Sequence, residues 1–315
     1  MTYDAILLIA FGAPEKLEDV RPFLANVLRG RPVPSSRIEE VVGHYEALGG
    51  RSLLTEITLR QARALGRRLA EDGLPIPVHV GMRNWHPYIA ETLERMAEGG
   101  IRRALGLILS VHQSEAGWDR YQKDVEEARG RLGSKAPLVD FAPGWHDHPR
   151  FIEVQAELVG AALAQVEAES RPHTPLLFTA HSLPAAAAGV SEYTAQVADT
   201  AARVAGRLGH SRWSVAYQSR SGDPRTPWLE PDIDKAMAEL GASGAREVVI
   251  APIGFVCDHV EVLYDLDIAN RRLAAKHGMR QIRAATANDH PIFIAMLADV
   301  VQDAFGSRPG GGPKP

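Results

Sequence analysis

Short runs of aliphatic and β-branched residues recur along this chain, separated by longer segments with helical periodicity. The runs lack the strict apolar–polar alternation of a strand with one face in water. They therefore predict strands that are buried on both faces. The predicted strands are Ala5–Ala10, Val78–Gly81, Ala104–Ser110, Leu176–Ala180, Arg212–Tyr217 and Glu247–Pro252.

The intervening segments predict helices. Thr58–Asp72 is the clearest, because Leu59, Ala62, Leu65 and Leu69 form one apolar stripe among Arg and Glu residues. Tyr193–Leu208 and Pro231–Leu240 have similar patterns. Strands and helices that alternate in this way favour an α/β fold with parallel sheets and right-handed crossovers.

The length of 315 residues predicts two domains, at roughly 150 residues each. We place the first at 1–149 and the second at 150–305, with a helix over 150–166 bridging them. The segments AILLIAFGAP (5–14) and PLLFTAHSLP (175–184) open the halves in a similar way, which makes a duplication plausible. The tail 306–315 is rich in Gly and Pro and is predicted to be disordered.

Composition excludes several classes of function. A net charge of −4 and 6% aromatic residues argue against nucleic-acid binding. The single cysteine, Cys257, rules out an internal disulfide and a metal site made of four cysteines from one chain. No apolar stretch reaches the roughly 18 residues of a membrane-spanning helix. We expect a soluble, cytoplasmic protein.

Ligands of open α/β sheets bind beyond the carboxyl ends of the strands. Histidine follows several predicted strands, at His86, His112, His181 and His259. One such histidine is more often an ordinary loop residue, whereas several converging on one crevice favour chemistry. The motifs of a serine nucleophile elbow, a phosphate-binding loop and a zinc protease helix are all missing from the sequence.

The segments FTAHSLP and PIGFVCDHVEVLYDLD carry the strongest candidates. His181 should stand at the rim of the sheet, where a near-neutral imidazole accepts a proton or binds a divalent metal. We expect a helix to begin near Asp258, with Asp258 as its N-cap. Glu261 and Asp265 would then share one helical face and accept protons or hold a hydrated cation. The alternative is a solvated acidic face.

Two loops supply further candidates. Gly49-Gly50 marks a turn, after which Ser52 or Thr55 would cap the next helix. A second loop leads to Tyr121, which either donates to an anion from a helix or simply packs. Arginines near the first loop, including Arg29, suit carboxylate groups, although ordinary surface arginines are the alternative.

The chain resembles the ferrochelatases in four motifs, which occur in the order YEALGG, FTAHSLP, YQSRSGDPRTPWLEPD and PIGFVCDHVEVLYDLD. The resemblance implies two Rossmann-like domains, each with a four-stranded parallel sheet, and a porphyrin cleft between them. It implies a lyase that inserts Fe2+ into a porphyrin and releases two protons. His181 and Glu261 would be the catalytic and metal-binding residues, on opposite walls facing the porphyrin centre.

The resemblance also bears on the substrate. Positions that bind peripheral carboxylates in coproporphyrin-type members fall on Arg29, His44, Tyr45, Ser52 and Tyr121. Phe11 stands where many of these enzymes have an axial Tyr, and Asp265 lies on a possible outer path for the metal. The segment 28–45 is short and polar, whereas membrane-associated protoporphyrin enzymes have a longer apolar lip there.

This pattern favours coproporphyrin III as the substrate, with iron coproporphyrin III as the product. Three alternatives stay open: a protoporphyrin IX ferrochelatase, a cobalt or nickel chelatase, and a non-catalytic tetrapyrrole or haem carrier. The expected partners are the porphyrin and ferrous iron, with transient contacts to other haem-pathway enzymes. We expect a monomer that needs no cofactor beyond its substrate iron and holds no iron–sulfur cluster.

Overall fold

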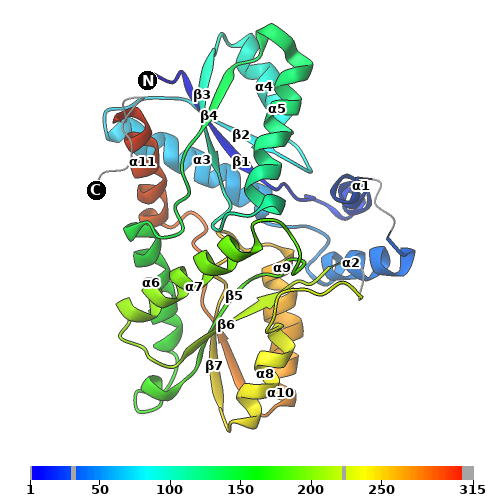
Figure 1. Ribbon diagram of the computed structural model, residues 1–315, viewed down its shortest axis with the longest axis vertical. Coiled ribbons are helices and arrows are strands. Elements are labelled where there is room, and N and C mark those ends of the chain that lie inside the picture. The colour runs from blue at the N-terminus through cyan, green and yellow to red at the C-terminus, as the bar shows by residue number, and fades with distance from the viewer. Residues whose placement is uncertain (1, 30–32, 222–224, 307–315) are drawn as a thin grey trace.

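A computed structural model describes residues 2–29, 33–221 and 225–306. The described chain forms two four-stranded parallel sheets, one in each half of the sequence (Figure 1). The first sheet has the order β2-β1-β3-β4. Its strands are β1 (Ala5–Ala10), β2 (Val78–Met82), β3 (Arg103–Ile108) and β4 (Leu138–Phe141).

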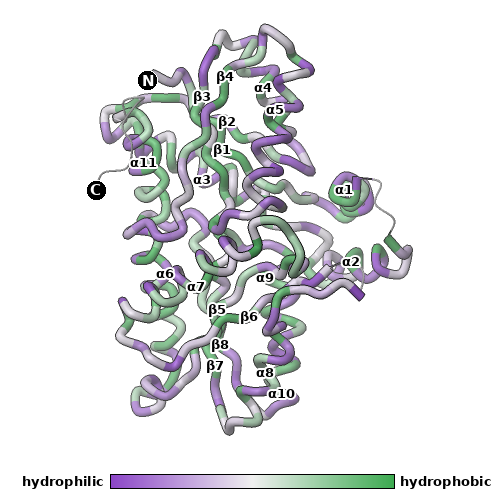
Figure 2. Tube along the Cα trace, in the orientation of Figure 1, coloured by the Kyte–Doolittle hydropathy of each residue, from purple (hydrophilic) through white to green (hydrophobic). Residues whose placement is uncertain are grey.

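The second sheet repeats this arrangement with the order β6-β5-β7-β8. Its strands are β5 (Leu176–His181), β6 (Trp213–Gln218), β7 (Glu247–Ala251) and β8 (Arg280–Arg283). In both sheets the first strand of the half therefore lies in the interior, between the second and the third. This placement is why β1 and β5 are almost entirely apolar and appear green in Figure 2.

Helices cover both faces of each sheet (Figure 1). On the first sheet, Leu7 and Ile9 pack toward α4 and α5, whereas Ile6 and Leu8 join a core with residues of α3 and α11. That second core continues through α6 and α7 to Phe178 of β5, so one apolar cluster spans both halves. The helices named here are α3 (Leu54–Glu71), α4 (Ile89–Glu98), α5 (Arg120–Leu132), α6 (Pro149–Leu163), α7 (Val190–Arg207) and α11 (Pro291–Gly306).

The remaining helices lie on the other face of the second sheet or near the junction of the halves. α8 (Ile233–Ala242) and α10 (Arg271–Lys276) contact each other and pack on the second sheet. α1 (Leu17–Leu28) and α2 (Ser35–Ala47) project at the level between the sheets, where α9 (Val260–Leu263) also lies (Figure 1). Among the described residues, none of the helices is long and apolar enough to cross a membrane.

The predicted α/β class and every predicted strand are confirmed, but β4 and β8 were not predicted from their residues. The bridging helix is present as α6. The boundary between residues 149 and 150 stays a prediction, since the apolar core crosses it. Of the predicted disordered tail, Gly306 is the last residue of α11, and 307–315 lie outside the described residues.

Candidate active site

Three neighbouring strand ends of the second sheet build the candidate site. His181 is the last residue of β5, and Gln218 and Ser219 stand at the end of β6 beside it. The turn after β7 leads to Glu261. This turn approaches β5 so closely that a side chain at Gly254 would place its Cβ 2.8 Å from the Cα of Ala180. A glycine there lets the Glu261 segment lie next to His181.

Hydrogen bonds fix the orientation of His181. Its Nδ1 lies 2.5 Å from the carbonyl oxygen of Ser182, which only accepts, so Nδ1 carries a proton. The other ring nitrogen, Nε2, is then the one that gains or loses a proton. The Tyr193 hydroxyl donates to the carbonyl oxygen of His181 at 2.8 Å and anchors the backbone of the same residue.

Nε2 of His181 lies 3.7 Å from Oε1 of Glu261. This distance corrects the expectation that the two residues stand on opposite walls, because no macrocycle fits between groups so close. They share a wall since β5 and β7 are neighbours in one sheet. Both side chains stay partly open, with 31% and 41% of their surfaces exposed.

The pair shifts the acidity of both groups. Burial alone would lower the pKa of His181, but the Glu261 carboxylate and the bond to Ser182 raise this pKa to about 8. Burial would raise the pKa of Glu261, whereas the charge and hydrogen bond of His181 lower it to about 2. At neutral pH the free protein therefore holds an imidazolium–carboxylate pair.

Backbone contacts hold Glu261 in place. Gln218 donates from Nε2 to the Glu261 carbonyl oxygen at 2.8 Å, and the Glu261 N–H donates to Nδ1 of His259 at 3.1 Å. His259 is thus the N-cap of α9, and the expectation for Asp258 was wrong. Asp258 instead accepts from Arg283 and from the side-chain amide of Asn288, which directs its carboxylate away from the helix start.

Asp265 stands one turn beyond Glu261, at the start of a π-helical turn over Asp265–Asn270. The Ser219 hydroxyl donates to its Oδ2 at 2.5 Å. Burial raises the pKa of Asp265 to about 6, with Glu261 adding to the rise and the bond from Ser219 opposing it. Two carboxylates of different acidity therefore lie beside one imidazole.

Two tyrosines from the first half face the same region. Burial raises the pKa of Tyr45, on α2, and the negative charge of Glu261 raises it further. Burial also raises the pKa of Tyr121, on α5, where Arg83 opposes the rise and Glu261 adds to it. Both phenols thus lie within electrostatic reach of Glu261, and the predicted helix at Tyr121 is confirmed.

The other predicted substrate contacts each have partners of their own. The His44 ring stacks on Tyr264 with 3.8 Å between ring centroids. Phe11 is exposed and meets Phe23 edge to face. Ser52 is buried and accepts from the N–H of Leu54, but the N-cap of α3 is Leu53 and no side chain caps the helix, so the capping expectation for Ser52 or Thr55 was wrong.

The four strand-end histidines do not all converge. His181 and His259 meet at the second sheet, as described above. His112 is buried, and its Nε2 lies 3.1 Å from the Thr200 hydroxyl. His86 is exposed and pairs with Glu91 at 3.1 Å. Only the histidines of neighbouring strands in one sheet share a site.

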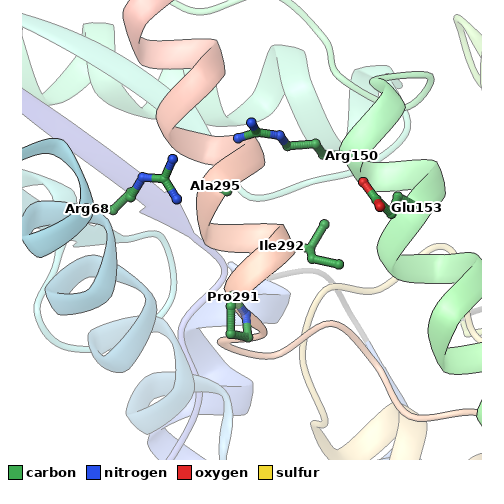
Figure 3. Close-up of a pocket in the computed structure, with 6 residues that line it drawn as sticks. All are labelled: Arg68, Arg150, Glu153, Pro291, Ile292 and Ala295. Atoms are coloured by element: carbon green, nitrogen blue, oxygen red, sulfur yellow. The ribbon is translucent and has the colours of Figure 1, made fainter. Parts of the chain in front are cut away.

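A hollow of about 270 Å3 lies elsewhere, between α3, α6 and α11 (Figure 3). Arg68 and Arg150 line it, but Asp72 and Asp299 hold them as ion pairs. No strand-end residue lines this hollow. It adds nothing to the chemistry at His181.

The arrangement suits a reaction that removes protons and handles a divalent cation. His181 in its neutral form presents the Nε2 lone pair, and Glu261 and Asp265 present carboxylate oxygens. These are ligands that Fe2+ accepts. Sequence reasoning missed the supporting roles of Gln218, Ser219 and Tyr193, although the first two directly follow a predicted strand.

We expect the rate to depend on the proton at His181. The neutral form decreases as the pH falls below about 8, so kcat/KM should fall about tenfold per pH unit there and level off above. In Glu261→Gln the anion that raises the pKa of His181 is gone, and burial now lowers it. The midpoint of the residual activity should therefore move down by at least one pH unit. A pH–rate profile of both proteins measures this shift, and equal midpoints would contradict the ion pair.

The chain is similar in sequence, and over its fold, to known proteins. The ferrochelatase family model matches residues 3–305. A ferrochelatase of Rhodopirellula baltica is 41% identical over 96% of this chain and 87% of that protein. A coproporphyrin III ferrochelatase of Mycobacteroides abscessus is 41% identical over 98% of this chain and 91% of that protein. The structure of a Bacillus subtilis sirohydrochlorin chelatase with cobalt, 10% identical, covers 96% of this chain and 95% of its own with a TM-score of 0.57, a likeness of fold.

Proposed function

Because this chain belongs to the ferrochelatase family, we propose that it inserts Fe2+ into coproporphyrin III. The two pyrrole N–H bonds break, two iron–nitrogen bonds form in their place together with two dative bonds, and two protons leave. No electron is transferred, since the iron enters and remains ferrous. The protein must therefore bind the ring, accept protons and guide the metal.

The pair of His181 and Glu261 carries this proposal. Nε2 of neutral His181 accepts a pyrrole proton, and the resulting imidazolium is stabilised by the carboxylate 3.7 Å away. Glu261 and Asp265 offer oxygen ligands to the incoming cation or accept the second proton. Ser219 holds Asp265 in place for this role.

The names of relatives and the hydrogen-bond donors of the first half support the proposed substrate. Three of the proteins most similar to this chain, at 39–41% identity, are named coproporphyrin III ferrochelatases. Arg29, Tyr45 and Tyr121 come from the first half and supply donors for peripheral carboxylates. Coproporphyrin III carries four carboxylates and protoporphyrin IX carries two. Several donors for peripheral carboxylates therefore favour coproporphyrin III as the substrate.

Initial rates with the two porphyrins, side by side in low detergent, test the substrate. We expect kcat/KM for coproporphyrin III to exceed that for protoporphyrin IX by at least tenfold. The ratio compares one enzyme with two rings of the same core, so it is independent of protein folding. A preference for protoporphyrin IX would identify the alternative ferrochelatase.

The same assay separates the remaining alternatives. A cobalt or nickel chelatase would insert those metals faster than iron, and a carrier would bind the ring without turnover. We propose that no cofactor beyond the substrate iron is needed, since Cys257 alone cannot ligate a four-cysteine cluster and is buried against Ala13, Leu54 and Ile57. A cytoplasmic location, a monomeric state and contacts with other haem-pathway enzymes stay predictions.

A further inference from the structure

Three charged side chains from distant parts of the first half meet beside Tyr121. Asp124 accepts two hydrogen bonds from Arg29, at 3.0 Å on Oδ1 and 3.2 Å on Oδ2. Nε of Arg83 lies 2.6 Å from Oδ2 of the same carboxylate. Asp124 thus joins the residue that follows α1, the residue that follows β2 and helix α5.

Burial differs sharply between the two arginines. The Arg83 and Asp124 side chains are only 9% and 8% exposed, whereas Arg29 is 40% exposed. Burial lowers the pKa of Arg83, and Asp124 counters this effect. The inner pair is therefore a buried ion pair in which Asp124 compensates the burial of Arg83 only in part, since Nε of Arg83 lies close to the carboxylate without a hydrogen bond to it. Arg29 adds a positive charge at the open side of this pair.

Arg29 also needs a fixed partner for geometric reasons. Its backbone is left-handed, with φ at 45°, and it ends α1 at the C-cap. A long side chain at such a position loses rotamer entropy when it binds a ligand, unless another contact has already ordered it. The bidentate contact with Asp124 uses two of its five N–H donors and leaves the others for a second anion.

We propose that Asp124 is a positioning residue that orders Arg29 to receive one peripheral carboxylate of the porphyrin. This inference rests on the proposed function. It adds to that function a contact that distinguishes a ring with a carboxylate beside Arg29 from a ring without one there. Two guanidinium groups against one carboxylate leave one positive charge, which matches one propionate. Tyr121, one turn before Asp124 on α5, lies at the same corner.

The test is Asp124→Asn, which keeps the shape and removes the charge. We expect the Kd for coproporphyrin III, from fluorescence quenching without iron, and its KM to rise about tenfold. The kcat should stay within about twofold, because His181 and Glu261 are untouched, and the Kd for protoporphyrin IX, which has two carboxylates fewer, should rise less than the Kd for coproporphyrin III. Asp140→Asn is the matched control, since Asp140 pairs with Arg103 at 2.7 Å on another part of the first sheet.

A double-mutant cycle shows whether Asp124 acts through Arg29. If it does, Arg29→Ala combined with Asp124→Asn should bind coproporphyrin III no worse than Arg29→Ala alone. Losses that multiply, an unchanged Kd, or equal losses for both porphyrins would each overturn the proposal. Should Asp124→Asn fail to fold, Arg29→Lys serves instead, because lysine keeps the charge but cannot make the bidentate contact.

In that variant the same tenfold loss for coproporphyrin III is expected, with a smaller loss for protoporphyrin IX, and wild-type affinity would overturn the proposal. The wild-type protein separates the two levels of inference. If it does not prefer coproporphyrin III, the proposed substrate fails. If it does prefer coproporphyrin III and Asp124→Asn binds like wild type, only the role of Asp124 fails.

Discussion

Replacing His181 by alanine should lower the rate of iron insertion by about a thousandfold or more. A well-placed general acid or base contributes about 10²–10⁴ to a rate, and His181 combines proton acceptance with a position for the metal. Its ring orientation is set by Ser182 and its charge by Glu261. Initial rates of iron coproporphyrin formation, followed by absorbance, give the loss.

Porphyrin binding should survive this substitution, because the predicted carboxylate donors belong to other elements. A fluorescence titration of His181→Ala should give a Kd within about threefold of wild type. His173→Ala is the matched control, since His173 is exposed in a turn that precedes the opposite end of β5. Turnover at the wild-type rate in His181→Ala would remove His181 from the catalytic machinery.

The second large effect is expected for Glu261→Gln, with a loss of about a hundredfold or more in kcat. Glutamine is nearly isosteric and can keep the contacts of its backbone to Gln218 and His259. It neither accepts a proton at neutral pH nor neutralises the imidazolium on His181. The loss is expected in kcat rather than in KM, because the carboxylate acts on protons and metal.

Asp265→Asn is the informative comparison for Glu261→Gln. Asp265 lies one turn farther along, and its pKa of about 6 makes it the weaker charge at neutral pH. We expect Asp265→Asn to raise the apparent KM for Fe2+ by severalfold and to change kcat less than Glu261→Gln does. Metal titrations at saturating porphyrin measure both constants. A wild-type kcat in Glu261→Gln would reduce Glu261 to a surface acid.

Sequence reasoning succeeded where a single local pattern determines the structure. The apolar runs at β1, β5 and β7 are buried on both faces, and the periodic stripe of α3 is equally explicit. His181 could be predicted because it directly ends such a strand. β4 and β8 were not predicted because each has only four residues. In addition, β8 has the sequence RQIR and carries a charged side chain at each end.

The site was harder to predict wherever partners are distant in sequence. The predicted N-cap of α9 was wrong by one residue. Asp258 accepts hydrogen bonds from Arg283 and Asn288, which lie on a later segment, and His259 is the N-cap. The resemblance led us to place Glu261 opposite His181, whereas strand order brings them to 3.7 Å. The contact between Arg29 and Asp124 joins residues 95 positions apart, which no local pattern reveals.

If His181 and Glu261 catalyse metal insertion, the protein must form many iron porphyrins per molecule, and a turnover assay measures this. Purified protein at a hundredth of the porphyrin concentration, with Fe2+ under anaerobic conditions, should convert coproporphyrin III to its iron complex over many cycles. We expect tens of equivalents of product per protein, falling to background in His181→Ala. Product that stops at one equivalent, or none beyond the rate without protein, would show that His181 and Glu261 do not catalyse the insertion.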